Sequence, residues 1–392
     1  MNRKEIAGKL RNFAFNLGLK QVMWIRVRHI LLAVMTLAAP LGMSALEMPA
    51  DSVSGSKSQT RWIGQLIDNR FQIHDSTIYY PAFPRVILDI YNWGDRTFNS
   101  YDERYVVGTG TNWKLQGKAY GWAETQTMLF PKNSLLSMHS NLYSDAGAYI
   151  SFMAVSVGYM WNMDKLFDHN TKRHTFNFDF TCSRFSINYS SVSSEGGMIL
   201  TSLGDYNDGK DFRYDFDGVS IKNTNIDAYY FFNHSRYSHA AAYSFSKYQL
   251  RTAGTAIVGL NLAEMDSNLD FSGLPEDMRD ALPLEQPYFK FHHRDIAVLG
   301  GYARNWVLKP RRWLLNMTLM GALGYKRTYE DATDASRNLL ANNYKACLSC
   351  VYNHRKLFAS AQLRSTGSLY YNSNFTHFST FSSLTLTVGM RF

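Results

Sequence analysis

The chain has 392 residues, with 25 Tyr, 25 Phe and 8 Trp but only 9 Pro, and 45% of its residues are hydrophobic. Beyond residue 45 it has no run of roughly 18 apolar residues, which a membrane-spanning helix requires, so the sequence argues against a helical membrane protein. The formal net charge is +9, but seven basic residues and one acid precede Leu46, so the remainder gives nucleic-acid binding little electrostatic support.

Residues 1–45 have the order expected of a secretory signal peptide. Basic residues precede an apolar core at 30–39, and small residues follow up to Ala45, where we expect cleavage. The basic region is long, and a translation start at Met23 would give a more compact leader. The alternative is a single amino-terminal helix, amphipathic or buried. No cysteine lies near the cleavage region, so a lipid-anchored mature terminus is not expected.

Residues 46–82 are predicted to form a short periplasmic segment. A polar linker at 51–60 is followed by four apolar residues at helical spacing: Trp62, Ile63, Leu66 and Ile67. This spacing predicts a short helix near the mouth of the domain that follows.

Alternation of apolar and polar residues dominates residues 83–392 and predicts antiparallel strands. Phe176, Phe178 and Phe180 share one face, and polar residues occupy the other. The same period recurs in three further apolar sets: Phe185, Ile187 and Tyr189; Leu315, Met317, Leu319 and Leu323; and Leu357, Ala359, Ala361 and Leu363. In a membrane barrel the apolar face meets lipid and the polar face lines the lumen.

The last strand favours a membrane barrel over a soluble β-sandwich, which is the alternative fold. Its apolar face comprises Leu384, Leu386, Val388, Met390 and Phe392. A soluble domain rarely ends on an unprotected apolar strand, because exposed strand edges and frayed termini are liabilities. In an outer-membrane barrel such a strand closes the cylinder, and its terminal aromatic resembles the signal read by the barrel-assembly machinery.

The number of alternating runs predicts an all-β transmembrane antiparallel barrel of about 12 strands, with about 10 to 14 as the range. Long polar insertions fall at 162–173, 204–218, 263–287, 326–342 and 366–376. Most of these are assigned to the cell exterior, because barrels keep their periplasmic turns short. The insertion around 274–283 has room for one or two helical turns between prolines and could fold inward as a plug.

Two sets of polar residues are expected to have structural roles. Three arginines are candidates for polar lumen residues that could fill it and leave no open path: Arg184, Arg304 and Arg364. Four residues are expected to form a strand-ending turn: Asn92, Trp93, Gly94 and Asp95. The alternative for the turn is that Asp95 pairs with Arg96 or Arg104 inside the lumen.

Neither a metal site nor a cofactor is predicted. Five aspartates between 205 and 217 suggest calcium, but Gly209 and Lys210 break the ordered spacing of a calcium-binding loop. Cys347 and Cys350 form a CxxC motif, yet residues three apart on a strand point to opposite faces. Two thiols are also too few ligands for a closed zinc site.

The alternative function is an outer-membrane lipid hydrolase, in which a histidine activates a serine near the outer leaflet. The raw material consists of His139 with Ser140 and Asn141, His234 with Ser235, and His377 with Ser379. None of these has nucleophile-elbow context. Adjacent strand residues also face opposite sides, so only His377 and Ser379 would share a face. The sequence therefore favours a protein without enzymatic activity.

Four segments resemble a family of uncharacterised Bacteroidota outer-membrane barrels that carries the label domain of unknown function 4421. They are residues 79–102, 106–115, 148–159 and 180–189. The resemblance implies location and architecture only, because no activity, ligand or functional residue accompanies the label. We therefore expect an outer-membrane barrel with a structural or passive transport role. Its expected partners are outer-membrane lipids and the barrel-assembly machinery, without nucleic acid, and its small-molecule ligand is unknown.

Overall fold

The computed structural model of the chain describes residues 100–392 apart from seven short gaps. The gaps are 112, 132–133, 153–154, 164–171, 283–286, 334–336 and 372–374. Nine earlier positions are also described: Gly64, Gln65, Asp68, Ile78, Tyr80, Pro81, Arg85, Leu88 and Asp89. All of these belong to the unit from Gln59 to Phe392. The predicted signal peptide and the predicted turn at Asn92, Trp93, Gly94 and Asp95 lie outside the described residues.

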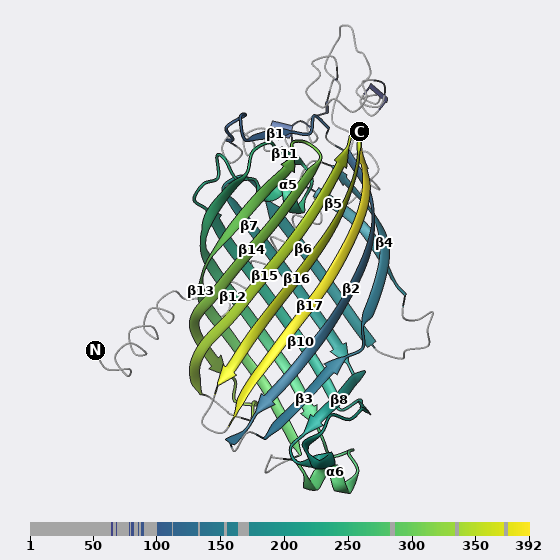
Figure 1. Ribbon diagram of the computed structural model, residues 1–392, viewed down its shortest axis with the longest axis vertical. Coiled ribbons are helices and arrows are strands. Elements are labelled where there is room, and N and C mark those ends of the chain that lie inside the picture. Colours follow the sequence, from purple (N-terminus) through teal and green to yellow (C-terminus); the bar gives the residue numbers. More distant parts are fainter. Residues whose placement is uncertain are drawn as a thin grey trace, which may run out of the picture. The chain divides into compact units, whose positions relative to one another are not determined.

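Fifteen strands form one antiparallel sheet that curls into a barrel (Figure 1). They are β2 (Trp113–Leu129), β3 (Leu135–Ser140), β4 (Tyr143–Phe152), β5 (Val155–Asn162), β6 (Lys172–Thr181), β7 (Phe185–Glu195), β8 (Met198–Leu203), β9 (Tyr214–Phe216), β10 (Val219–Phe231), β12 (Ala253–Asp270), β13 (Tyr288–Lys309), β14 (Trp313–Thr328), β15 (Asn338–His354), β16 (Leu357–Tyr371) and β17 (Thr376–Arg391). Curling satisfies the backbone groups that a flat sheet would leave unpaired at its edges.

The two ends of the barrel are named after the short helices beside them. The helix α5 (His239–Tyr243) lies at the end that carries the C-terminus, and α6 (Glu276–Asp280) lies at the other end (Figure 1). A single 3-10 turn, η4 (Tyr206–Gly209), follows β8. None of the described helices is long and apolar enough to cross a membrane.

Ten strands complete the circle at the α6 end. β9 and β10 follow each other in the chain and occupy one position in this circle. The order is β2, β3, β8, β9 with β10, β12, β13, β14, β15, β16 and β17, and β17 pairs with β2 again. Only Asp217 and Gly218 separate β9 from β10, and the Gly218 carbonyl accepts from the Asp270 N–H at 2.7 Å. The hydrogen-bonding ladder therefore continues from β8 to β12 around the wall.

The wall widens toward the α5 end. There β4 pairs with β2 and β5, and β7 pairs with β6 and β10, so the described pairings form a row of twelve strands from β5 to β6. The change occurs at Gly196 and Gly197, which both have φ of +70°. This left-handed conformation, which glycine adopts readily, lets β8 leave β7 and join β3. The predicted range of 10 to 14 strands is confirmed.

The last residue of the chain is built into this closure. β17 pairs with β2 from Thr376 opposite Leu129 to Arg391 opposite Lys114. Beyond the strand, the Phe392 N–H donates to the Trp113 carbonyl at 3.0 Å, and the Trp113 N–H donates back to Phe392 at 3.1 Å. The first and last long strands are therefore joined along their whole length.

The strands sort their side chains by polarity. On β17 the outward set is apolar and exposed, namely Leu384, Leu386, Val388 and Met390. Ser383, Thr387 and Arg391 alternate with them and are buried on the inner side. β14 follows the same rule, with Leu315, Leu319 and Leu323 outside. Apolar residues thus cover the outer surface, and polar residues line the inside.

The strand boundaries differ from the prediction in two ways. The first strand of the large sheet begins at Trp113, well after the predicted start at residue 83, and the described residues Arg85, Leu88 and Asp89 are helical. Proline preorganises the first turn of a helix, and the Arg85 N–H donates to Pro81 at 3.0 Å. Strands β12, β14 and β16 also extend into the predicted insertions, because their alternation continues through polar residues.

Candidate functional site in the barrel lumen

Two ion pairs lie inside the lumen, and the first of them joins distant walls. Asp227 of β10 and Lys345 of β15 form an ion pair, and three strands separate them along the wall. The Asn261 amide donates to Asp227 Oδ1 at 2.8 Å, and the Asn225 amide donates to Oδ2 at 2.8 Å. The Asp227 carboxylate is thus fully enclosed by partners.

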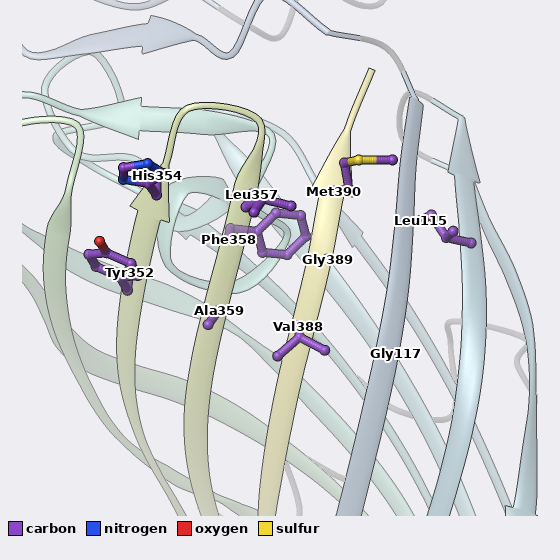
Figure 2. Close-up of a pocket in the computed structure, with 10 residues that line it drawn as sticks. All are labelled: Leu115, Gly117, Tyr352, His354, Leu357, Phe358, Ala359, Val388, Gly389 and Met390. Carbon is purple, nitrogen blue, oxygen red and sulfur yellow. The ribbon is translucent and has the colours of Figure 1, made fainter.

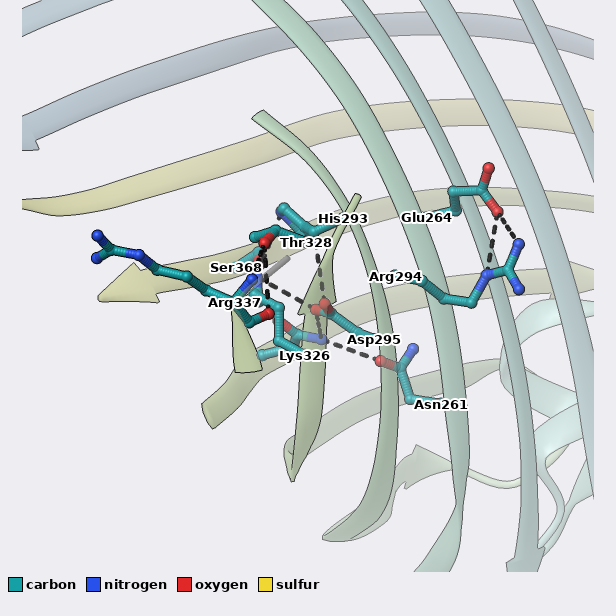
Figure 3. Close-up of polar contacts among 10 residues, drawn as sticks. Asn261, Glu264, His293, Arg294, Asp295, Lys326, Thr328, Arg337 and Ser368 are labelled. Atoms are coloured by element: carbon teal, nitrogen blue, oxygen red, sulfur yellow. Dashed lines mark hydrogen bonds and ion pairs between the residues drawn. The ribbon is translucent and has the colours of Figure 1, made fainter. Parts of the chain in front are cut away.

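The second ion pair, drawn in Figure 3, joins Asp295 of β13 and Lys326 of β14. Lys326 Nζ lies 3.3 Å from Asp295 Oδ2, and His293 Nδ1 lies 3.0 Å from Asp295 Oδ1. The Asn343 amide bridges the two pairs, because it donates to Asn261 at 3.0 Å and reaches Asp295 at 3.4 Å. We call the connected set the luminal polar network: Asp227, Lys345, Asn261, Asn343, Asp295, Lys326 and His293.

Burial makes this network depend on its pairing. The side chains of Asp227 and Asp295 are each 1% exposed, and that of Lys326 is 0% exposed. Burial of one unpaired charge in such a place would destabilise the folded barrel by about several kcal/mol, which is the desolvation penalty of a single ion. The two carboxylates and the two ammonium groups therefore stabilise one another. Arg294 and Glu264 form a 2.9 Å pair nearby, but their side chains are 40% and 31% exposed.

An apolar cluster fills the lumen at the α6 end. It brings together buried side chains from β2, β3, β8, β9, β10, β12, β13 and β16, among them Met128, Met138, Leu200, Phe271, Phe291 and Tyr370. Phe291 of β13 also stacks on His377 of β17, with ring centroids 4.2 Å apart, across the width of three strands. Met278 of α6 and Leu274, which precedes the helix, are buried in this cluster. The helix expected in the insertion around residues 274–283 is confirmed as α6, and it lies against the apolar cluster.

At the α5 end, residues 232–252 fold into the lumen between β10 and β12. We call this stretch the inward-folded segment. It contains α5, whose residues His239, Ala240, Ala241 and Ala242 are all buried. The Ser238 hydroxyl caps the helix by accepting from the Ala241 N–H at 3.2 Å. A helix this short is not stable alone, so its surroundings must hold it.

Six consecutive strands hold the inward-folded segment through its backbone carbonyls or side chains. Asn305 of β13 donates to Ser238, Ser349 of β15 donates to Ala242, Lys114 of β2 donates to Ser244, and Arg391 of β17 donates to Phe245, at 2.7 to 3.0 Å. On β14, Asn316 accepts from the Tyr243 hydroxyl at 2.7 Å. On β16, the ring of Phe358 packs against Phe245.

The segment is also paired with the chain that precedes the barrel. β1 (Val106–Gly108) and β11 (Lys247–Gln249) form a separate two-stranded antiparallel sheet.

Burial, together with the nearby charges of Arg364 and Lys345, lowers the pKa of His239 in α5 to about 3, so this histidine is neutral at neutral pH. A neutral ring suits its tilted packing against Tyr243, at 4.3 Å between ring centroids.

The three predicted lumen arginines have three different locations. Arg364 lies on the inner side of β16, because its neighbour Leu363 is 47% exposed outside. Arg184 lies in the turn between β6 and β7, where its carbonyl accepts from the Phe231 N–H at 2.8 Å. Arg304 contradicts the prediction, because it is exposed on the outer side between two fully buried residues, Ala303 and Asn305. Its guanidinium lies 5.7 Å from the Trp306 ring at the α5 end.

Two of the three candidate histidine–serine sets have other hydrogen-bond partners. His377 and Ser379 both face inward, but Gln126 lies between them, with its side-chain oxygen on His377 Nε2 and its amide donating to Ser379 at 3.0 Å. His139 Nδ1 contacts the Ser140 carbonyl rather than its hydroxyl.

The two cysteines of the CxxC motif are free thiols. Cys347 is buried on the inner side, and Cys350 is partly exposed. Among the described residues, no group of three or more potential metal ligands occurs.

The luminal polar network was not identified from the sequence. A signal was present, because Asp227, Asp295, Lys326 and Lys345 all occupy the polar phase of an alternating strand. Their pairing depends on which strands face one another across the lumen, and alternation does not contain that information.

These features together define the class of protein. Outward-facing apolar residues cover long antiparallel strands, the inner face is polar, and the backbone of the wall is hydrogen-bonded from strand to strand. A chain that spans a lipid bilayer with strands must have this arrangement. The protein is a transmembrane β-barrel. It belongs to the family described as Domain of unknown function (DUF4421), whose model matches residues 100–392.

Solved structures of other barrels are similar at a low level. The outer membrane protease OmpT from Escherichia coli is 10% identical with a TM-score of 0.34, covering 73% of this chain and 98% of its own. The translocator domain of autotransporter NalP from Neisseria meningitidis is 9% identical with a TM-score of 0.29, covering 72% and 89%. A Pseudomonas aeruginosa FadL homologue is 9% identical with a TM-score of 0.24, covering 72% and 91%. Such similarity says nothing about activity. No curated protein matches the sequence.

Proposed function

We propose that the protein resides in a bacterial outer membrane, with its α5 end in the periplasm. The turns between β13 and β14 and between β15 and β16 are short at this end, and longer connections follow β12, β14 and β16 at the α6 end. Outer-membrane barrels have short periplasmic turns and long external loops, which supports this orientation. The apolar outer face of β17 and its terminal Phe392 suit recognition by the assembly machinery.

We further propose that the barrel has a structural role, with a lumen that stays closed at rest. The observation that carries this proposal is the succession of three fillings along the barrel axis: the inward-folded segment, the luminal polar network and the apolar cluster. Each joins strands that are not neighbours in the wall. A solute would have to pass the fillings at both ends, so the barrel anchors the chain in the membrane without conducting.

The proposal assigns no catalysis to the barrel. His377 contacts Gln126 and the ring of Phe291, and Gln126 also contacts Glu124, so the best candidate histidine and serine are held apart by a hydrogen-bonded amide. Passive transport is the second role that the sequence favours. It would require the inward-folded segment to leave the lumen, and that segment is an insertion between two strands that pair without it.

Conductance in planar bilayers distinguishes a closed barrel from a channel. We would compare the wild type with three variants: one that replaces residues 233–250 by a short turn, one with Phe291→Ser and Tyr370→Ser, and their combination. If the two ends seal independently, the wild type and each single-end variant carry no stepwise current, whereas the combination conducts. Each variant must first show a heat-modifiable gel band, which reports that it has folded.

Stepwise conductance of the wild type would overturn the closed state, and conductance of the variant lacking residues 233–250 alone would favour gated transport. An unchanged, silent combination would show that the polar network seals the lumen by itself. In that case Asp227 and Lys345 would be the next positions to replace.

A further inference from the structure

A groove lies on the outer, lipid-facing surface near the α5 end. Neighbouring strands align small residues there: Gly117 of β2 is opposite Ala148 of β4, and Ala119 is opposite Ala146. On one side Val388 of β17 is opposite Gly117 and forms a ridge, and on the other side Trp161 of β5 is opposite Ala146 and forms a wall. This part of the groove has a volume of about 420 Å³.

The groove continues across β17 toward β16 and β15 (Figure 2). This second part has a volume of about 590 Å³ and shares Gly117 and Val388 with the first. Ala359 lies in the same row, opposite Val388. Leu357 and His354 line the end of the groove, so it opens onto the turn between β15 and β16. The surface is therefore an apolar channel that ends at the edge of the barrel.

That edge is strongly basic. The turn that borders the groove consists of Arg355 and Lys356, both exposed. The end of β13 contributes Lys309, and the neighbouring turn between β13 and β14 contributes Arg311 and Arg312, all of them exposed. Among the described residues none of these five side chains forms an ion pair, and neither turn contains an acid. Such a cluster beside a membrane attracts anionic headgroups.

We infer that this groove binds an anionic glycerophospholipid of the adjacent leaflet, with the phosphate on Arg355 and Lys356 and an acyl chain along the small-residue floor. Ala359 is three residues beyond Lys356, which places the apolar channel about 10 Å from the cations at the strand rise of about 3.3 Å per residue. That spacing suits a headgroup joined to its acyl chain by glycerol. The inference rests on the proposed membrane placement but not on the closed lumen.

Native mass spectrometry of the full chain in detergent tests the site. The probes are dioleoylphosphatidylglycerol, which is anionic, and dioleoylphosphatidylcholine, which has no net charge and the same acyl chains. Gly117→Leu fills the floor, and it is compatible with the fold because a Cβ there meets only Val388 Cγ2 at 3.6 Å. Its matched control is Gly321→Leu, at an exposed strand glycine of β14 where an added Cβ would meet no atom within 4 Å.

The headgroup contribution is tested by Arg355→Asn with Lys356→Gln. Arg355 has φ of +54°, in the left-handed region, and asparagine tolerates that conformation. The matched control is Lys210→Gln with Arg213→Gln, two exposed cations at the α6 end. We expect the turn variant to lose phosphatidylglycerol affinity by about thirtyfold, from about 1 kcal/mol per cation, and to keep its phosphatidylcholine affinity. Gly117→Leu should weaken both lipids, and both controls should bind like the wild type.

Equal binding of the two lipids by the wild type, or equal loss in a variant and its control, would overturn the site. If Gly117→Leu instead converts a dimer to a monomer with lipid binding intact, the groove is covered by a second copy of the chain and the lipid assignment is wrong. The bilayer conductance described above is unaffected by these variants, so failure of this inference is distinguishable from failure of the proposed closed lumen.

Discussion

At the scale of residues, the ion pair between Asp227 and Lys345 connects two distant parts of the wall. The Asp227 side chain is 1% exposed and has two amide donors besides the lysine. Removal of one partner from such a pair is more harmful than removal of both, because the remaining charge stays buried without compensation. The pair therefore holds β10 and β15 together across the lumen, whatever its net contribution to the free energy of unfolding.

We predict that Lys345→Met destabilises the folded barrel by about 3 kcal/mol, because Asp227 remains charged and buried. Asp227→Asn combined with Lys345→Met should recover much of that loss, since no charge stays buried and the oxygen of the new amide can still accept from the Asn261 amide. The measurement is the midpoint of thermal unfolding in detergent, followed by gel mobility. Additive effects of the two substitutions would show that the residues are not coupled.

A second prediction concerns His239, whose pKa in the folded protein is about 3 against an ordinary value of 6.5. The folded state favours the neutral ring, so its contribution to stability is present above pH 6.5 and is lost as the pH falls toward 3. The groups that face it are Tyr237, Tyr243, Lys345 and Arg364.

Hydrogen exchange of the α5 amides, corrected for the intrinsic pH dependence, should show protection declining between pH 6.5 and pH 3 in the wild type. In His239→Phe the aromatic packing remains and the titrating group is absent, so this decline should largely disappear. The same decline in both proteins would assign it to other groups.

The residue type alone did not predict which side of the barrel wall an arginine faces. Arg304 of β13 and Arg364 of β16 are the same residue type on strands of one wall, yet Arg364 faces the lumen and Arg304 faces outward. The phase of the strand decides this, and Ala303 and Asn305 set that phase in β13. A long basic side chain can face outward near the end of a strand, because it can extend to the polar headgroups.

At the scale of elements, strands were predictable and the inward-folded segment was not. The apolar period of β14, β16 and β17 appears in the sequence as it appears on the outer wall. The segment 232–252 has no comparable local signal, since its helix is short and its position depends on hydrogen bonds from Lys114, Asn305, Ser349 and Arg391. Contacts so distant along the chain cannot be inferred from local spacing.

We predict that the barrel folds without this segment. β10 and β12 are paired from Val219 opposite Leu269 to Phe231 opposite Ile257, independently of residues 233–250. The shortened variant should therefore keep a heat-modifiable gel band, with a lower thermal midpoint because Asn305, Asn316 and Arg391 lose partners. Failure of that variant to fold, with a wild-type control assembled in parallel, would make the segment part of the folding nucleus.

At the scale of the whole molecule, composition and period were sufficient for the class of fold. Abundant aromatics, few prolines and an apolar terminal strand predicted an antiparallel barrel of about 12 strands. They could not predict a wall that changes from ten strands at one end to twelve at the other, because that change depends on two glycines, Gly196 and Gly197, and on which strand β8 joins. The strand order of a barrel is a property of long-range pairing.

The chain forms a transmembrane β-barrel, and we propose that this barrel lies in the outer membrane. Heat modifiability of the protein extracted from outer-membrane fractions tests this claim most directly. We expect an unboiled sample to run as a compact, fast band, and boiling to shift it to the mobility of the unfolded chain. A protein released into the soluble fraction, with the same mobility before and after boiling, would contradict it.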